Sequence, residues 1–237
     1  MKQSVAVVLV VLAGLAVSLF GSSPSHVGAQ SAATIIGEVK LVGEAPTPKM
    51  LKVSKDTEAC GQEKPSEELV VGPNKGVKWA VASLLDAKGG NSDASKKMVV
   101  DQNGCAFKPH VTLVPAGGPV DILNNDGILH NFHTFSTANP SINKAQPKFK
   151  KVMTEKFDKP EIVQIKCDAH SWMSGWIVVT DHPYHAVTDD AGTFKLEGVP
   201  PGKHTVQVWH ESLGKQVKEI EVKAGETVKV VFELKRG

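Results

Sequence analysis

Residues 161–180 read EIVQIKCDAHSWMSGWIVVT, and this stretch decides the fold that we expect. Apolar and polar residues alternate in part of EIVQIKC, and WIVVT is a second β-branched run, so we predict two strands joined by a loop. The joining segment holds Cys167, His170 and Met173. A thiolate, an imidazole and a thioether form a soft donor set, which favours copper over magnesium, calcium or manganese. The stretch therefore predicts a β fold with a copper-ligand loop.

A further ligand is expected from a strand beside this loop. The segment 124–133, NNDGILHNFH, offers His130 at the start of a new run after a turn. Zinc is the weaker alternative, because zinc sites ordinarily use two or more Cys or His pairs and have little use for Met. In a regular strand His130 and His133 face opposite sides, so His133 is an extra or alternative ligand only if the strand bulges. We leave both interpretations of His133 open.

The two motifs resemble the cupredoxins, the blue-copper electron carriers. NNDGILHN is similar to the plastocyanin-type signature, and CDAHSWMSGWIVV resembles the short amicyanin ligand loop, Cys-x2-His-x2-Met. The upstream FKPHVTLVPAGGPVDIL resembles the strand before the first ligand, so the likeness runs from Phe107 to Val179. It implies a single type 1 copper ion, with His130, Cys167 and His170 as the equatorial ligands and Met173 as the weak axial ligand.

The same resemblance gives roles to three neighbours of the ligands. Asn131 is expected to hydrogen-bond across to the cysteine loop and so to restrain the site. Trp172 is expected to form an apolar cover, with a docking patch around an exposed edge of His170. Asp168 is expected beside the ligands, where multicopper oxidases and copper nitrite reductases have a bridging His. Four ligands also leave no open position for a substrate, so we expect a carrier and not an enzyme.

The remainder of the chain shows short β-branched runs broken by Gly, Pro and Asn, which predict an all-β protein built from sandwiches. We assign residues 30–182 to a Greek-key, cupredoxin-like copper domain. Residues 183–237 resemble the carboxypeptidase regulatory-like β domains in the TDDAG turn, the TFKL strand, the VPPG turn and the HTVQV strand. This segment is short for a complete sandwich, so strand 33–43 is expected to cross over to it. Residues 136–151 are expected to form a polar surface loop.

Composition and the N-terminus bear on location. The 237 residues are 41% hydrophobic with a formal net charge of +2, which does not predict nucleic-acid binding. Residues 1–29 are expected to be a cleaved export signal, or else an uncleaved membrane anchor. The protein is then periplasmic or at the cell surface. Three cysteines occur, and we pair Cys60 with Cys105 as a disulfide, which leaves Cys167 for a metal.

From these features we expect an exported one-electron carrier that works between redox proteins such as a dehydrogenase or a cytochrome. Contact with a membrane is expected only if the N-terminal segment is not cleaved. Two alternatives stay open: a copper(I) storage or delivery protein, and a metal-free adhesion or carbohydrate-binding β-sandwich. The sequence does not name the redox partner, the potential or the oligomeric state.

Overall fold

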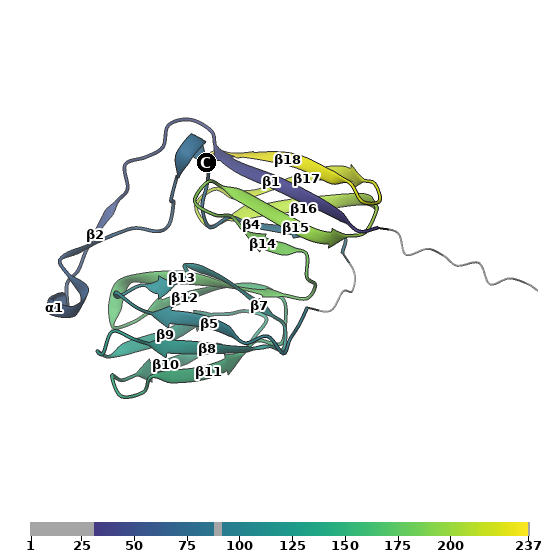
Figure 1. Ribbon diagram of the computed structural model, residues 1–237. Coiled ribbons are helices and arrows are strands. Elements are labelled where there is room, and N and C mark those ends of the chain that lie inside the picture. Colours follow the sequence, from purple (N-terminus) through teal and green to yellow (C-terminus); the bar gives the residue numbers. More distant parts are fainter. Residues whose placement is uncertain (1–30, 88–91, 237) are drawn as a thin grey trace, which may run out of the picture.

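The computed structural model describes residues 31–87 and 92–236, which form two β-sandwiches and a strap (Figure 1). The all-β fold class predicted from the sequence is confirmed. The predicted export signal, residues 1–29, lies outside the described residues. Within the part of the chain that the structure describes, no helix has both the length and the apolar character needed to cross a membrane.

The first sandwich consists of a five-stranded sheet in the order β10-β9-β12-β13-β7 and a four-stranded sheet in the order β11-β8-β5-β6. Most neighbouring strands are antiparallel, but β13 pairs with β7, and β5 with β8, in parallel. The strands are β5 (Met98–Gln102), β6 (Phe107–Lys108), β7 (Val111–Pro115), β8 (Pro119–Asn124), β9 (His130–Phe135), β10 (Asn143–Gln146), β11 (Val152–Lys156), β12 (Glu161–Cys167) and β13 (His170–Thr180).

The second sandwich pairs a three-stranded sheet, β15-β1-β18, with a four-stranded sheet, β14-β4-β16-β17. A short 3-10 helix, η1 (Pro73–Lys75), precedes β4. The strands are β1 (Ala33–Leu41), β4 (Val81–Leu84), β14 (His185–Val187), β15 (Thr193–Val199), β16 (Gly202–His210), β17 (Gly214–Val222) and β18 (Thr227–Leu234). The second sandwich therefore takes β1 and also β4 from the range 30–182, because β4 finds its hydrogen-bonding partners in β14 and β16.

Alternating burial explains why these segments are strands. In β1 every second residue, from Ala33 to Leu41, is buried, so one face of the strand lies in the core. Each sandwich has its own core, with Phe232 fully buried in the second and Phe107 and Phe132 in the first. A smaller apolar cluster joins the two sandwiches, and its buried members are Val81, Val111 and Val178.

A strap, residues 42–70, leaves the second sandwich after β1 and returns before β4. It contains β2 (Met50–Lys52), the one-turn helix α1 (Thr57–Cys60) and β3 (Glu63–Pro65). Figure 1 shows the strap running to one end of the first sandwich, where α1 lies. Val53 is buried in the core of that sandwich, and the predicted disulfide between Cys60 and Cys105 is present, with the Cα atoms 5.4 Å apart. The strap is thus anchored at this end of the first sandwich.

The expectation of a loop over residues 136–151 is wrong in part, because β10 lies within this range. β10 pairs with β9, and Gln146 faces His130 in the register. Its first three residues are exposed, so the segment carries none of the apolar alternation by which strands are recognised. Gln146 is fully buried and hydrogen-bonds to Gln102.

Candidate metal centre

Three strand ends bring the central residues of the site together. His130 begins β9, Cys167 ends β12 and His170 begins β13. β12 lies between β9 and β13 in the sheet, and the β12–β13 register shifts beside Cys167. The adjacent strands and the tight turn between Cys167 and His170 therefore place the three side chains at one end of the first sandwich.

The donor atoms form a compact triangle. His130 Nδ1 lies 3.1 Å from His170 Nδ1, and Cys167 Sγ lies 3.8 Å from His130 Nδ1 and 3.6 Å from His170 Nδ1. The centre of the circle through these atoms is about 2 Å from each of them, close to the length of metal–nitrogen and metal–sulfur bonds, about 2.0–2.3 Å. All three residues are buried, with exposed fractions of 0%, 2% and 0% for His130, Cys167 and His170.

The free ring nitrogens of both histidines face carboxylates. His130 Nε2 lies 2.8 Å from Asp126 Oδ2, and His170 Nε2 lies 2.9 Å from Asp56 Oδ2. A carboxylate accepts the N–H of Nε2, so the lone pair of each neutral ring is at Nδ1, the atom that faces Cys167. The residues therefore fit a metal ion: two imidazole lone pairs and one sulfur converge, and the opposite edges of both rings are fixed.

The pKa values of the two histidines diverge. Burial lowers the pKa of His130, but hydrogen bonds with Asp126 and Cys167, together with their charges, raise the pKa of this ring to about 9. Burial lowers the pKa of His170, and the nearby His130 charge adds to this, against the raising effect of Asp56. In the metal-free chain at neutral pH, His130 is therefore the protonated ring, and its Nδ1–H can donate to His170 Nδ1.

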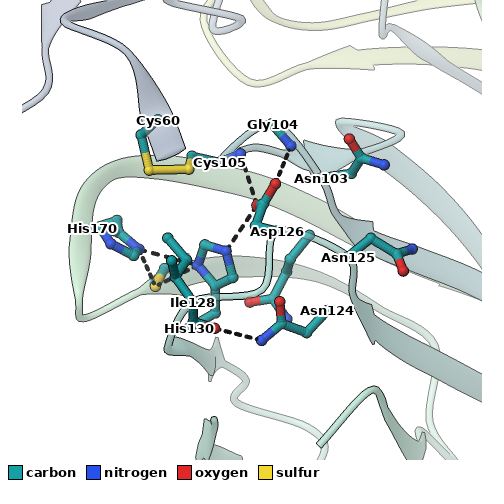
Figure 2. Close-up of polar contacts among 12 residues, drawn as sticks. Cys60, Asn103, Gly104, Cys105, Asn124, Asn125, Asp126, Ile128, His130 and His170 are labelled. Atoms are coloured by element: carbon teal, nitrogen blue, oxygen red, sulfur yellow. Dashed lines mark hydrogen bonds and ion pairs between the residues drawn. A yellow bond between two sulfur atoms is a disulfide. The ribbon is translucent and has the colours of Figure 1, made fainter. Parts of the chain in front are cut away.

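Sequence reasoning did not find Asp56 or Asp126 as parts of this site. Asp126 lies in the turn that precedes His130 and also accepts hydrogen bonds from the backbone N–H groups of Gly104 and Cys105, as Figure 2 shows. Asp56 is more than a hundred residues from His170 in the chain and reaches it through the strap. No spacing rule connects such positions, so no local signal could have identified Asp56.

The neighbours of Cys167 and His170 lie in two groups. The backbone N–H of Asn131 donates to Cys167 Sγ at 3.3 Å, and the side-chain oxygen of Asn131 accepts from the Asp168 backbone N–H at 3.1 Å. Trp172 is buried, with its ring 4.9 Å from that of His170, and its indole N–H donates to the Cys105 carbonyl. Asn131 thus links β9 to the turn after Cys167, and the buried ring of Trp172 packs beside His170.

The expectation of an exposed His170 edge is wrong. Asp56 and the strap cover this ring, so a docking patch cannot be centred on His170 itself. Met173 is 1% exposed and belongs to the same core cluster as Cys167. Its role as an axial ligand stays a prediction.

His133 lies apart from the triangle. It follows the strand alternation, so that it is half-buried on the other face of β9. Its Nδ1 contacts Asp168 Oδ1 at 3.0 Å, and its ring stacks on Phe135. A second grouping of Cys105, Asp126 and His130 is also compact, but Cys105 is in the disulfide and has no thiolate to offer.

Comparison with family models agrees with one of the two resemblances seen in the sequence. Residues 176–235 match the family model of the carboxypeptidase regulatory-like domain. No curated protein matches the chain. Among solved structures, a mutant of amicyanin with Cu(I) matches at 17% identity and a TM-score of 0.33, covering 42% of this chain and 98% of that chain.

Two further solved structures come from named organisms. A purple cupredoxin from Nitrosopumilus maritimus matches at 17% identity and a TM-score of 0.30, covering 35% of this chain and 98% of that chain. A copper-containing nitrite reductase from Thermus scotoductus SA-01 matches at 23% identity and a TM-score of 0.32, with 41% of this chain and 24% of that chain covered.

Proposed function

We propose that this protein is an exported type 1 copper protein that carries single electrons between redox partners. The observation that supports this most directly is the buried triangle of His130 Nδ1, Cys167 Sγ and His170 Nδ1. Two imidazoles and one thiolate in a plane, with a thioether nearby, are the donor set of blue-copper electron-transfer sites. Met173 is the proposed axial ligand.

When bound, the copper ion supplies a one-electron redox couple, and the chain supplies a fixed donor geometry. Each histidine would then be held at both ring nitrogens: Nδ1 would bind the ion, and Nε2 faces a carboxylate. The sulfur of Cys167 accepts the Asn131 N–H, which ties the sulfur to β9. Donor atoms that keep their places in both oxidation states favour fast electron exchange.

The closed surroundings of the site favour a carrier over an enzyme. The three donors are almost completely buried, and Trp172, with 8% exposure, packs beside His170. A substrate would have to displace Asp56 or Trp172 to reach the triangle. We therefore propose electron exchange with partner proteins, such as a dehydrogenase or a cytochrome, in the periplasm or at the cell surface.

One observation favours a second candidate, a copper(I) storage or delivery protein. Asp56 covers the ring edge of His170, so external ligands are kept from a bound ion and no exposed ring edge is left for a redox partner. The two candidates differ in redox behaviour. A carrier cycles reversibly between copper(I) and copper(II), whereas a delivery protein holds copper(I), resists oxidation and yields the ion to an acceptor.

An anaerobic copper titration followed by optical and spin-resonance spectra tests the proposal. We expect one copper ion per chain, an intense visible thiolate-to-copper(II) band after oxidation, and reversible loss of the band on reduction. Cys167→Ser should abolish the band and leave the β-sheet circular dichroism unchanged. A colourless complex that resists oxidation would favour delivery, and a folded protein that binds no copper would favour the metal-free adhesion or carbohydrate-binding alternative.

Two histidines of β9 provide a matched control. His130→Gln removes a proposed ligand, whereas His133→Gln removes an imidazole from the same strand on the opposite face. We expect His130→Gln to lose the visible band and His133→Gln to keep it. A band that depends on His133 and not on His130 would contradict the proposed ligand set.

A further inference from the structure

The strap connects the disulfide to the edge of the metal centre. Helix α1 of the strap starts directly after Asp56 and ends at Cys60, whose backbone N–H donates to the Asp56 carbonyl at 2.9 Å. Cys60 is buried and bonded to Cys105 of the first sandwich. The position of Asp56 is therefore fixed by one helical turn that ends at a covalent anchor.

The disulfide also lies next to the second carboxylate. Asp126 accepts the Cys105 N–H at 2.8 Å and contacts His130 Nε2 at 2.8 Å, and Figure 2 shows this carboxylate between the two groups. Cys105 is thus bonded through its backbone N–H to the Asp126 carboxylate, and Cys60 to the backbone carbonyl of Asp56. The Asp126 carboxylate contacts His130 and the Asp56 carboxylate contacts His170. The strap therefore orients the ring of His170, and the first sandwich orients the ring of His130.

Asp56 adopts a backbone conformation that few residues accept. Its φ and ψ angles are 51° and 38°, in the left-handed region, where Asp and Asn are tolerated better than most non-glycine residues. This conformation accompanies the contact between its side chain and His170 Nε2 at 2.9 Å. A surface groove of about 320 Å³ is lined by residues 56–59 and Ile128.

We propose that Asp56 is a positioning residue for His170, and that the strap that carries it closes the metal centre. The carboxylate accepts the Nε2–H, which keeps the Nδ1 lone pair directed at Cys167, and the strap keeps solvent and external ligands from the ring. The purpose of this arrangement rests on the proposed copper function, but the arrangement itself belongs to the metal-free chain.

The metal-free protein gives the first test. Cys167 is the single cysteine outside the disulfide, so a thiol reagent reports how often the centre opens. We expect Asp56→Ala to react about tenfold faster than the wild type or more, since a hydrogen bond to a charged group is lost. Asp56→Asn keeps an oxygen that accepts the Nε2–H, so this variant should react at close to the wild-type rate.

Nitrogen NMR of His170 gives a readout that a loss of packing alone would not move. The spectra are recorded at pH 10, above the pKa of His130 of about 9, so that His130 no longer donates a proton to His170 Nδ1. The wild type and Asp56→Asn should then carry the proton of the neutral His170 ring at Nε2, and Asp56→Ala should show a mixture of the two tautomers. Glu58→Ala is the matched control, because Glu58 is exposed on the same strap and forms no hydrogen bond or ion pair with the described residues. This control should behave as the wild type in both measurements.

The anchor is tested by the double variant Cys60→Ser with Cys105→Ser, which leaves Cys167 as the one thiol. We expect faster labelling of Cys167, with a β-sheet circular dichroism spectrum like that of the wild type. Wild-type labelling rates and an unchanged His170 tautomer in Asp56→Ala would overturn the proposal. If the double variant does not fold, the labelling and NMR results of the single Asp56 substitutions, which keep the disulfide, decide the proposal.

Copper binding separates this proposal from the proposed function. Loss of an outer carboxylate typically weakens metal binding by about 10–100-fold, and we expect this of Asp56→Ala but not of Glu58→Ala. A wild type that binds no copper would defeat the electron-carrier proposal, yet the labelling and NMR results would still decide the role of Asp56. Copper bound equally well by Asp56→Ala would overturn the positioning role alone.

Discussion

His110 and Glu211 form a buried hydrogen-bonded pair across the junction of the two sandwiches. His110 precedes β7 of the first sandwich, and Glu211 follows β16 of the second. The two side chains are 1% and 10% exposed, so the contact is shielded from water. The pair lies beside the apolar junction cluster, since Trp79, which packs against that cluster, is 6.1 Å from the His110 ring.

Glu211→Ala should therefore destabilise the protein. A buried imidazole that loses its partner costs about 1–3 kcal/mol in the free energy of unfolding. Urea unfolding followed by tryptophan fluorescence measures this change. Glu219→Ala, an exposed position on β17, is the control and should change the free energy of unfolding by less than about 0.5 kcal/mol. Equal stability of the two variants would refute a role for the pair in joining the sandwiches.

Asp126→Ala should weaken copper binding by about 10–100-fold, because it frees the Nε2 edge of His130. It also removes the acceptor for the backbone N–H groups of Gly104 and Cys105, so we expect the metal-free protein to lose about 1–3 kcal/mol of stability. Competition with a copper chelator measures the first effect and urea unfolding the second. Asp158→Ala, which breaks an exposed pair with Lys156, should leave copper affinity unchanged.

Lowering the pH should destabilise the protein at pH values well above the pKa of its carboxylates. Burial lowers the pKa of both His185 and His210 to about 4, helped by repulsion from His182 and His110 respectively, from an ordinary value of 6.5. A lowered pKa in the folded state means that the unfolded chain takes up the proton first as pH falls. This stability is thus fully present above pH 6.5 and is lost as pH falls toward 4, with a slope of at most about 1.4 kcal/mol per pH unit for each group.

Urea unfolding at several pH values between 7.5 and 4 measures this loss in the metal-free protein. His210→Gln removes one of the two groups, so its stability should depend less steeply on pH. A slope identical to that of the wild type would show that His210 does not titrate in this range.

Glu161 should hold the segment that follows β9. Its carboxylate accepts hydrogen bonds from the backbone N–H groups of Thr137, Ala138 and Asn139. Burial opposes the charge, but these bonds lower the pKa of Glu161 to about 2 from 4.5, so its contribution is present above pH 4.5 and is lost as pH falls toward 2. Glu161→Gln should therefore loosen residues 136–142.

Limited trypsin digestion at neutral pH measures this loosening at the nearby lysines, beginning with Lys144. We expect cleavage to be several-fold faster in Glu161→Gln, because the free energy of local opening falls by about 1–3 kcal/mol. Glu197→Gln, in an exposed pair with Lys195, should be cleaved as the wild type. Unchanged digestion would mean that other contacts hold the segment.

The triangle of His130, Cys167 and His170 could be anticipated from sequence because its parts are local. Cys167 and His170 lie within one hairpin, and His130 begins a strand after an evident turn. Soft donors and β periodicity pointed to these segments, and the resemblance to the cupredoxins joined the three residues into one site. The carboxylates that contact the Nε2 atoms of the two histidines, Asp56 and Asp126, could not be anticipated in the same way. Asp56 meets His170 only because the strap crosses from the other sandwich, and that path depends on tertiary packing and not on periodicity.

The fold, too, was predictable from the sequence only in part. The all-β class follows from β-branched runs and turn residues, and β1 has a clear alternating pattern. The pairing of strands does not follow, since β4 is a four-residue buried run, VASL, without alternation. Such a run carries no information on which sheet it joins, so its place beside β16 could come only from the packed structure.

The strap begins and ends in the second sandwich, and this has a consequence for dissecting the chain. A protein cut after residue 182 would retain β1 without β15 and β18, and β4 without β14 and β16. Both ends of the strap would then join unpaired strands, and Asp56 would be held only through contacts with the first sandwich, among them the Cys60–Cys105 bridge and the buried Val53. The first sandwich with its strap is therefore not an independent module, and its transfer to another protein would require the second sandwich as well.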